Sequence, residues 1–219
     1  MTHPLEEFLG YRFQNPELLS RALTHRSMDT TTSNQRLEFL GDRVLGLVVA
    51  HMLFTEFPAE QEGELARRHA GLVSKEALAE IARQIGLGAH LSMSQSEDIS
   101  GGRENNSHLE DACEALIGAL YLDGGIQAGE EFIERYWKPM LLAVKTPPKD
   151  PKTSLQEWAQ ARGLALPEYV EISRNGPDHA PEFEIEVRVG KYSARGMAGA
   201  KRAAEQAAAS LLMATLPNV

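Results

Sequence analysis

The strongest constraint on the fold is a change in hydrophobic periodicity at Thr146-Pro147-Pro148-Lys149-Asp150-Pro151. Three prolines in six residues cannot continue a helix, so the sequence predicts a linker over residues 146–151. Before it, apolar residues recur at helical spacing, which predicts an all-α domain over residues 1–145. After it, residues 152–219 predict a helix, three strands and a second helix, which together make a small α+β domain.

Capping and helix-breaking residues divide the first domain into separate helices. We expect helices over residues 4–10, 35–56, 74–85, 108–122 and 128–143, another beginning at Asn15-Pro16, and a polar loop over 92–103. In the second domain we expect helices over 153–162 and 201–216, and strands over 167–173, 182–189 and 191–197. Apolar and charged residues alternate in the middle strand, which predicts a half-buried antiparallel sheet with both helices on one face.

The composition indicates an ordinary globular protein: 219 residues, of which 42% are hydrophobic, can form one large core or two modest ones. The single cysteine, Cys113, cannot form an internal disulfide, which fits a reducing cytoplasm. A small core residue is favoured over a catalytic thiol at this position. No signal peptide is expected, because Glu6 and Glu7 interrupt any apolar run, and Val44–Phe54 is too short to span a membrane. These features predict a cytoplasmic protein with no membrane partner.

Two carboxylates share one side of an apolar helix within residues 35–47. Glu38 and Asp42 are four residues apart and therefore lie within about 40° of each other around the helix, with Gln35 close beside them. The apolar residues expected to face the core on the opposite side are Leu37, Leu40, Val44, Leu47 and Val48. Two like charges at this spacing repel, so a cation between them is one explanation and a solvated acidic face is the other.

A second helix repeats the arrangement with Asp111 and Glu114, and the small residues Ala115 and Gly118 flank these carboxylates. The residues of its apolar stripe are Leu109, Cys113, Leu116, Ile117 and Leu120. If the two helices pack together, four oxygen donors meet, and such donors favour Mg²⁺. Glu62 is a candidate fifth donor. The net charge of −9 falls wholly on residues 1–150, because residues 151–219 hold equal numbers of acidic and basic residues.

The second domain places Lys201 and Arg202 at the start of its last helix, where the helix dipole disfavours cations. A phosphate bound at the helix N-terminus would explain both side chains, whereas plain solvation is the alternative. His179 lies in a turn between two strands and is a candidate to reach into a groove. Gln156 and Glu157, on the polar face of the first helix, suit contacts to hydroxyl groups and base edges, and suit water equally well.

Taken together, these features resemble bacterial ribonuclease III over almost the whole chain. The segments that carry the resemblance are residues 35–47, Ala22-Leu23-Thr24-His25-Arg26-Ser27 and Asp111-Ala112-Cys113-Glu114-Ala115-Leu116. The residues after the linker resemble a double-stranded-RNA-binding domain, including His179 and the Lys201-Arg202 helix start. The resemblance implies an endonuclease that hydrolyses double-stranded RNA to 5′-phosphate and 3′-hydroxyl ends. It also implies processing of ribosomal RNA precursors and of some messenger and transfer RNAs.

By the same resemblance, Glu38, Asp111 and Glu114 are expected to bind Mg²⁺, for which Mn²⁺ can substitute. Asp42 and Glu114 match the catalytic pair, and Glu62 matches a further carboxylate of the site. Bound metal acidifies the attacking water and stabilises the charge that develops during hydrolysis. The RNA-binding domain is expected to recognise the A-form helix through phosphates and 2′-hydroxyl groups.

The resemblance further implies a homodimer, with one site in each subunit. Phe39 points away from the leucine seam and suits a subunit interface, whereas a core phenylalanine is the alternative. The family usually has glutamate where Gln35 stands, so a dimeric RNA-binding protein with impaired cleavage is one competing function. The other is a helical scaffold whose acidic faces are only solvated.

Overall fold

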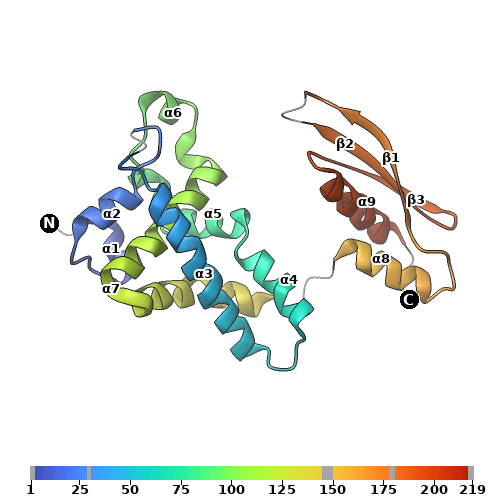
Figure 1. Ribbon diagram of the computed structural model, residues 1–219, viewed down its shortest axis with the longest axis horizontal. Helices are drawn as coiled ribbons and strands as arrows, with labels where there is room; N and C mark the ends of the chain where they lie inside the picture. Colours follow the sequence, from blue (N-terminus) through green and yellow to red (C-terminus); the bar gives the residue numbers. More distant parts are fainter. Residues whose placement is uncertain (1–2, 29–30, 145–149, 178–180, 217–219) are drawn as a thin grey trace. The chain divides into compact units, whose positions relative to one another are not determined.

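The computed structural model describes residues 3–28, 31–144, 150–177 and 181–216, and they form two compact units, Met1–Pro148 and Lys149–Val219. The first unit is helical (Figure 1). Its elements are α1 (Leu5–Leu9), α2 (Pro16–Ala22), α3 (Gln35–Glu56), α4 (Glu62–Leu72), α5 (Lys75–Gln84), η1 (Leu87–His90), α6 (Gln95–Ile99), η2 (Gly102–Glu104) and α7 (Asn106–Ala143). The all-α prediction for this part of the chain is confirmed.

The predicted helix boundaries are mostly confirmed by the caps. The Asn15 side chain accepts from the Glu17 N–H at the start of α2, and the Ser74 hydroxyl accepts from the Ala77 N–H at the start of α5. The predicted break after residue 122 is also present, because Gly125 has a φ of 73° and divides α7 into two helical stretches. The loop predicted over 92–103 is wrong in part: Ser94 caps the short helix α6 within it.

Helix α7 is the centre of the first unit. Its predicted apolar stripe is buried, including Cys113, whose side chain has no exposed surface. Residues on its other sides, such as Ala112, Ala115 and Ala119, are buried too, because α3 and α5 pack against it as well. Figure 1 shows α3 crossing α7 within the first unit.

The prediction for the core face of α3 is wrong at Leu47, whose side chain is 65% exposed. At about 100° per residue, Leu47 lies some 60° from Val44 and 100° from Val48, both of which are buried. The buried stripe instead extends the other way, through Leu45 and Val49, and so adjoins the carboxylates. The acidic side chains of α3 therefore lie at the edge of the packed face and not opposite it.

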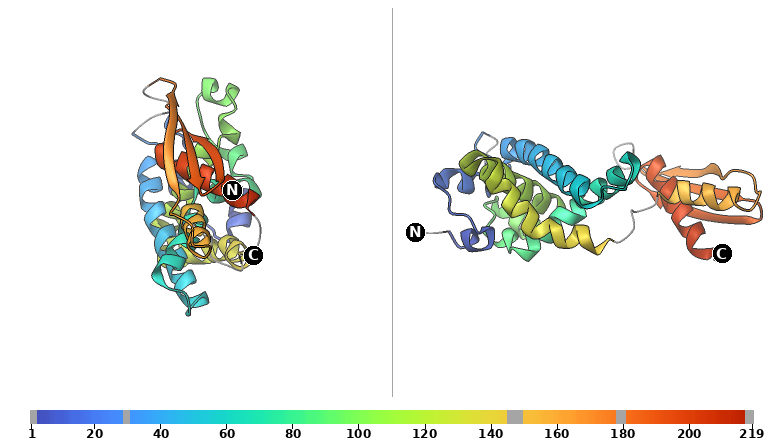
Figure 2. Two further views of the ribbon diagram at one scale, coloured as in Figure 1. Left: turned by 90° about the vertical axis from the view of Figure 1, so that its right-hand side faces the viewer. Right: turned by 90° about the horizontal axis from the view of Figure 1, so that it is seen from below.

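The second unit has the predicted α-β-β-β-α order: α8 (Pro151–Gln160), β1 (Glu168–Asn175), β2 (Glu182–Val189), β3 (Tyr192–Ala198) and α9 (Lys201–Thr215). The three strands form an antiparallel sheet in the order β1-β2-β3, and both helices lie on one face of it (Figures 1 and 2). Val187 and Val189 of β2 pack there with Leu155, Trp158 and residues of α9. Pro151, assigned above to the linker, is the first residue of α8. Among the described residues, no helix combines the length and apolar character needed to cross a membrane.

Candidate catalytic centre at a helix crossing

Two glycines let α3 and α7 approach until their backbones touch. A Cβ atom added to Gly41 would lie 1.7 Å from the carbonyl oxygen of Glu114, and one added to Gly118 would lie 2.3 Å from that of Leu37. No side chain fits at either position without separating the helices. Gly41 lies between Glu38 and Asp42, and Gly118 follows Glu114 by one helical turn, so the point of closest approach lies among the candidate carboxylates.

The carboxylates of the two helices act on one another across this crossing. Burial raises the pKa of Glu114 to about 8, and the charges of Asp42, Glu110, Glu38 and Asp111 add to the effect. Burial also raises the pKa of Glu38, with Asp111 as the next contribution. The pKa of Asp111 is raised by burial too. The structure therefore brings Glu38, Asp42, Asp111 and Glu114 into one partly buried acidic cluster.

Basic side chains around the cluster were not identified from the sequence. Arg26 lowers the pKa of both Glu38 and Asp111 and so opposes the effect of burial. Lys75, on α5, lies 3.6 Å from a carboxylate oxygen of Glu110. The Arg43 guanidinium pairs with Asp42, its neighbour in the chain. Glu110, a further acidic residue of the cluster, was missed although it lies four residues before Glu114, the same spacing that separates Glu38 from Asp42.

The donor chemistry of the cluster fits a hard divalent cation, because carboxylate oxygens from two helices meet with too few nearby cations to neutralise them. Among the described residues, no three Asp, Glu, His or Cys side chains are already drawn together around one point that could hold an ion. Glu38, Asp111 and Glu114 are the residues that could hold the metal, with Asp42 beside them.

The remaining predicted residues of this unit are exposed. Glu62 is exposed at the start of α4. Gln35 is exposed at the first turn of α3, where its side-chain oxygen lies 3.4 Å from the Ser33 hydroxyl. Phe39 is 64% exposed, with the Arg43 guanidinium 4.4 Å from the centre of its ring, so the core alternative for this residue is wrong.

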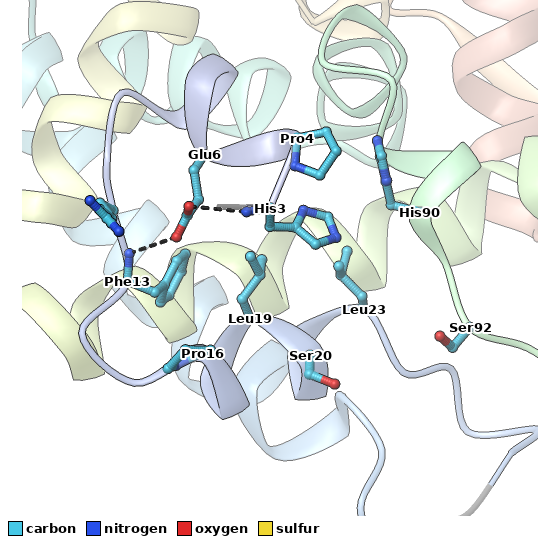
Figure 3. A pocket seen from close by; sticks show the side chains of 11 residues that line it. His3, Pro4, Glu6, Phe13, Pro16, Leu19, Ser20, Leu23, His90 and Ser92 are labelled. Carbon is cyan, nitrogen blue, oxygen red and sulfur yellow. Dashed lines mark hydrogen bonds between the residues drawn. The ribbon is translucent and has the colours of Figure 1, made fainter. Parts of the chain in front are cut away.

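A separate pocket of about 560 Å³ lies beside α1, α2 and η1 (Figure 3). The rings of His3 and His90 meet edge to face there, with their centres 5.1 Å apart. Both carboxylate oxygens of Glu6 accept backbone N–H groups, those of His3 and Phe13. None of the four clustered carboxylates lines this pocket.

In the second unit, the candidate RNA contacts are exposed. Gln156 and Glu157 lie on the outer face of α8, and Lys201 and Arg202 form the first turn of α9. The Lys201 ammonium lies 2.9 Å from a carboxylate oxygen of Glu171 on β1, and this ion pair raises the lysine pKa. The N-cap residue of α9 is Ala200, and no side-chain cap of this helix is present among the described residues. His179 lies outside the described residues, so its predicted role stays a prediction.

A helical unit with clustered carboxylates, followed by an α-β-β-β-α module, defines a two-domain nucleic-acid enzyme. Residues 15–141 match the family model described as Ribonuclease-III-like, and residues 151–216 match the one for the double-stranded RNA binding motif. The chain therefore belongs to the ribonuclease III family of endoribonucleases and carries a double-stranded-RNA-binding domain.

Similar proteins extend over nearly the whole chain. Ribonuclease 3 of Dinoroseobacter shibae is 53% identical over 96% of this chain and 93% of that protein. Ribonuclease 3 of Ehrlichia ruminantium strain Gardel is 46% identical over 99% of this chain and 97% of that protein. A solved structure of the nuclease domain of ribonuclease III from Campylobacter jejuni, described with a flexible region involved in dimer formation, is 41% identical to this chain. The match covers 62% of this chain and 98% of the solved chain, with a TM-score of 0.60.

Proposed function

We propose that this protein is a Mg²⁺-dependent endoribonuclease that hydrolyses phosphodiester bonds in double-stranded RNA to 5′-phosphate and 3′-hydroxyl ends. The observation that carries the proposal is the crossing at Gly41 and Gly118, which puts carboxylates of two helices into one partly buried cluster. A scaffold with solvated acidic faces would not need this, because burying like charges together costs stability unless something positive joins them.

In this proposal, Glu38, Asp111 and Glu114 hold Mg²⁺, which Mn²⁺ can replace, and Asp42 and Glu114 are the catalytic pair. The bound metal would supply positive charge that stabilises the developing negative charge on the phosphate and leaving oxygen. Asp42 orients the attacking water. The water oxygen bonds to phosphorus and the bond from phosphorus to the 3′-oxygen breaks, which leaves the two proposed ends. Glu62 is retained as a further carboxylate of the site.

Cleavage of a defined RNA hairpin tests the function directly. We expect the full chain to shorten the hairpin with Mg²⁺ and to leave it intact with EDTA, and the products to carry 5′-phosphates on end-group analysis. The alternative, an impaired RNA-binding protein, predicts a gel shift with intact RNA. In that case Gln35→Glu should turn an inert protein into an active one, and this outcome would overturn the proposal of a working enzyme.

We further propose that the protein acts as a homodimer through one face of α3. Phe39, Leu47 and Phe54 lie within about 80° of one another around this helix, and all three are more than 60% exposed. Exposed aromatic and aliphatic residues gathered on one face mark an interaction surface. Dimer formation is named for the Campylobacter jejuni nuclease domain, which supports a dimer for this chain as well.

The substitution Phe39→Glu should convert the dimer to monomers, because a charge would replace a central aromatic contact. A loss of about 2 kcal/mol or more would raise the dimer dissociation constant at least about thirtyfold. Light scattering after size-exclusion chromatography measures the mass at several concentrations. Ile99→Glu, at a side chain 79% exposed on α6, is the matched control and should stay dimeric. A monomeric wild type, or a dimeric Phe39→Glu variant, contradicts the proposed interface.

We propose that Gln156, Glu157, Lys201 and Arg202 contact double-stranded RNA, with His179 as a further contact. The open N-terminus of α9 and its two cations suit a phosphate, and the RNA would take the place of Glu171 beside Lys201. The proposed substrates are ribosomal RNA precursors and some messenger and transfer RNAs, and the proposed location is the cytoplasm.

The double substitution Lys201→Ala, Arg202→Ala should weaken RNA binding about tenfold or more in low salt. Each lost phosphate contact should also reduce the slope of log affinity against log salt by about 1. Fluorescence anisotropy with a labelled duplex at several salt concentrations measures both quantities. Arg188→Ala, on the sheet face away from the helices, is the control and should leave the slope unchanged. An unchanged slope for the double variant excludes these two contacts.

A further inference from the structure

Two buried histidines pack against each other beside the acidic cluster and have no part in the mechanism above. His25 is 4% exposed and His108 is 7% exposed, and their ring centres are 4.3 Å apart. His108 precedes Asp111 by three residues on α7, so the two side chains share one side of that helix. His25 comes from the segment after α2. The histidine pair therefore joins two separate parts of the chain one helical turn from Asp111, a candidate metal ligand.

Hydrogen bonds determine which nitrogen of His25 carries the proton. Its Nδ1 accepts the Ser27 backbone N–H at 3.2 Å and lies 2.9 Å from the Ser27 hydroxyl. That hydroxyl oxygen in turn accepts the Ser94 N–H at 2.9 Å, so the serine proton is available for Nδ1. In the neutral ring the proton must then be on Nε2. This Nε2–H is buried and has no hydrogen-bond partner within the described part of the chain.

The ring of His108 is held from the other side. Its Nδ1 lies 2.9 Å from the carbonyl oxygen of Gly102 in η2, which accepts its proton. Its Nε2 lies 3.5 Å from a carboxylate oxygen of Glu97 on α6. These two contacts hold the ring of His108, and the ring of His25 lies against it at an angle of 46°. His25 therefore presents one oriented donor that no described residue satisfies.

A buried N–H without a partner destabilises the folded protein, so this donor is expected to have an acceptor. The carboxylates that act electrostatically on His25 are those of Glu97 and Asp111. Glu97 already faces His108. Asp111, in contrast, lies one helical turn from His108 on the side of α7 against which His25 packs, so we take Asp111 as the acceptor. Conversely, Arg26, His108 and His25 are the groups that most favour the charged form of Asp111 by lowering its pKa. A buried water can bridge such a donor to a nearby carboxylate, since both are polar.

We propose that His25 is a positioning residue for Asp111: its Nε2–H donates through one bridging water to the Asp111 carboxylate and orients that carboxylate toward the metal. This inference rests on the proposed function, because it takes Asp111 as a Mg²⁺ ligand. Partners of this kind hold a ligand in its binding geometry, and their loss typically costs 10–100-fold in metal affinity or activity. The contact with the ring of His108 keeps the Nε2–H donor oriented.

Two substitutions separate this role from a purely structural one. His25→Gln can place an amide N–H where Nε2 stands, whereas His25→Asn places an oxygen where Nδ1 stands and offers no donor toward Asp111. We expect His25→Asn to weaken Mg²⁺ binding 10–100-fold, measured by calorimetric titration of the RNA-free full chain. His25→Gln should stay within about threefold of the wild type. If His25 serves only to anchor Ser27 through Nδ1, the order of the two variants reverses.

Controls keep the outcomes distinct. Ser27→Ala removes a partner of Nδ1 and leaves the Nε2 donor, so it should bind Mg²⁺ as the wild type does. If the melting temperature shows that His25→Gln does not fold, Ser27→Ala takes its place in the comparison with His25→Asn. If Glu114→Gln lowers the Mg²⁺ affinity but His25→Asn leaves it equal to that of the wild type, the role of His25 is overturned and the proposed function stands. If wild type and Glu114→Gln give the same titration, the proposed function fails first.

Discussion

Replacing Glu114 with glutamine should lower cleavage of double-stranded RNA by about a thousandfold or more while leaving the fold intact. In the proposed mechanism Glu114 is both a metal ligand and one of the catalytic pair, and a loss of about 4 kcal/mol of transition-state stabilisation corresponds to this factor. Single-turnover cleavage of a hairpin at saturating Mg²⁺ measures the effect. Glu110→Gln, which removes a charge of the same cluster from a residue outside the proposed ligand set, should cost less than about tenfold.

The same substitution should stabilise the metal-free protein at high pH. Because the fold raises the pKa of Glu114 from its ordinary value of 4.5 to about 8, the stability of the wild type should fall as the pH rises between these values. Glutamine removes that dependence. After discounting for solvent screening of a partly exposed group, we expect a gain of about 1–2 kcal/mol at pH 9 and almost none at pH 4.

Thermal unfolding with and without Mg²⁺ tests this linkage. Added Mg²⁺ should raise the wild-type melting temperature at pH 9 and should have a much smaller effect on Glu114→Gln. A variant that is less stable than the wild type at pH 9 without metal would show that Glu114 is compensated by partners other than a cation. A variant with full cleavage activity would overturn the proposed role of Glu114 in the reaction.

The second large effect is expected from Gly41→Ala, which adds a single methyl group where α3 meets α7. The new carbon would lie 1.7 Å from the carbonyl oxygen of Glu114, a backbone atom that can yield only if the helices move apart. Overpacking of this kind costs about 1–3 kcal/mol or more. The separation would also draw Glu38 and Asp42 away from the carboxylates of α7, so activity should fall further than stability alone explains.

Gly46→Ala is the matched control on the same helix. Its Cβ would meet the His69 ring at 3.8 Å, an ordinary contact, and alanine is favoured over glycine in a helix by about 1 kcal/mol. We therefore expect Gly46→Ala to be neutral or slightly stabilising. Chemical denaturation followed by the fluorescence of Trp137, in a Trp158→Phe background, reports on the first unit alone. Equal stability of the two alanine variants would contradict the close helix crossing.

Residue spacing predicted much of this arrangement, because each carboxylate pair lies within one helix and its periodicity is visible in the chain. The caps at Asn15 and Ser74 and the alternation in β2 were local signals of the same kind. The spacing predicted less well which faces of the helices pack together. Leu47 belongs to an apolar run, yet it lies outside the stripe that α7 covers.

The contacts between distant segments could not be predicted from spacing at all. Gly118 was recognised as a small residue beside the carboxylates, but the spacing does not show that Gly41 and Gly118 each meet a carbonyl group of the other helix. His25 and His108 are 83 positions apart and meet only because the segment after α2 folds against the start of α7. Periodicity describes the faces of one element, whereas these pairs depend on which faces meet.

The burial of Cys113 gives the first unit its own chemical reporter of local opening. The chain contains one cysteine, and its thiol is fully buried between α7 and the helices packed against it. Burial also raises the pKa of the thiol, so in the native state an alkylating reagent meets no exposed, reactive thiolate. Labelling therefore requires a local opening in which α7 separates from the helices packed against it. The rate of thiol modification, read by mass spectrometry, therefore follows the opening equilibrium of this interior in the intact protein, with no engineered probe.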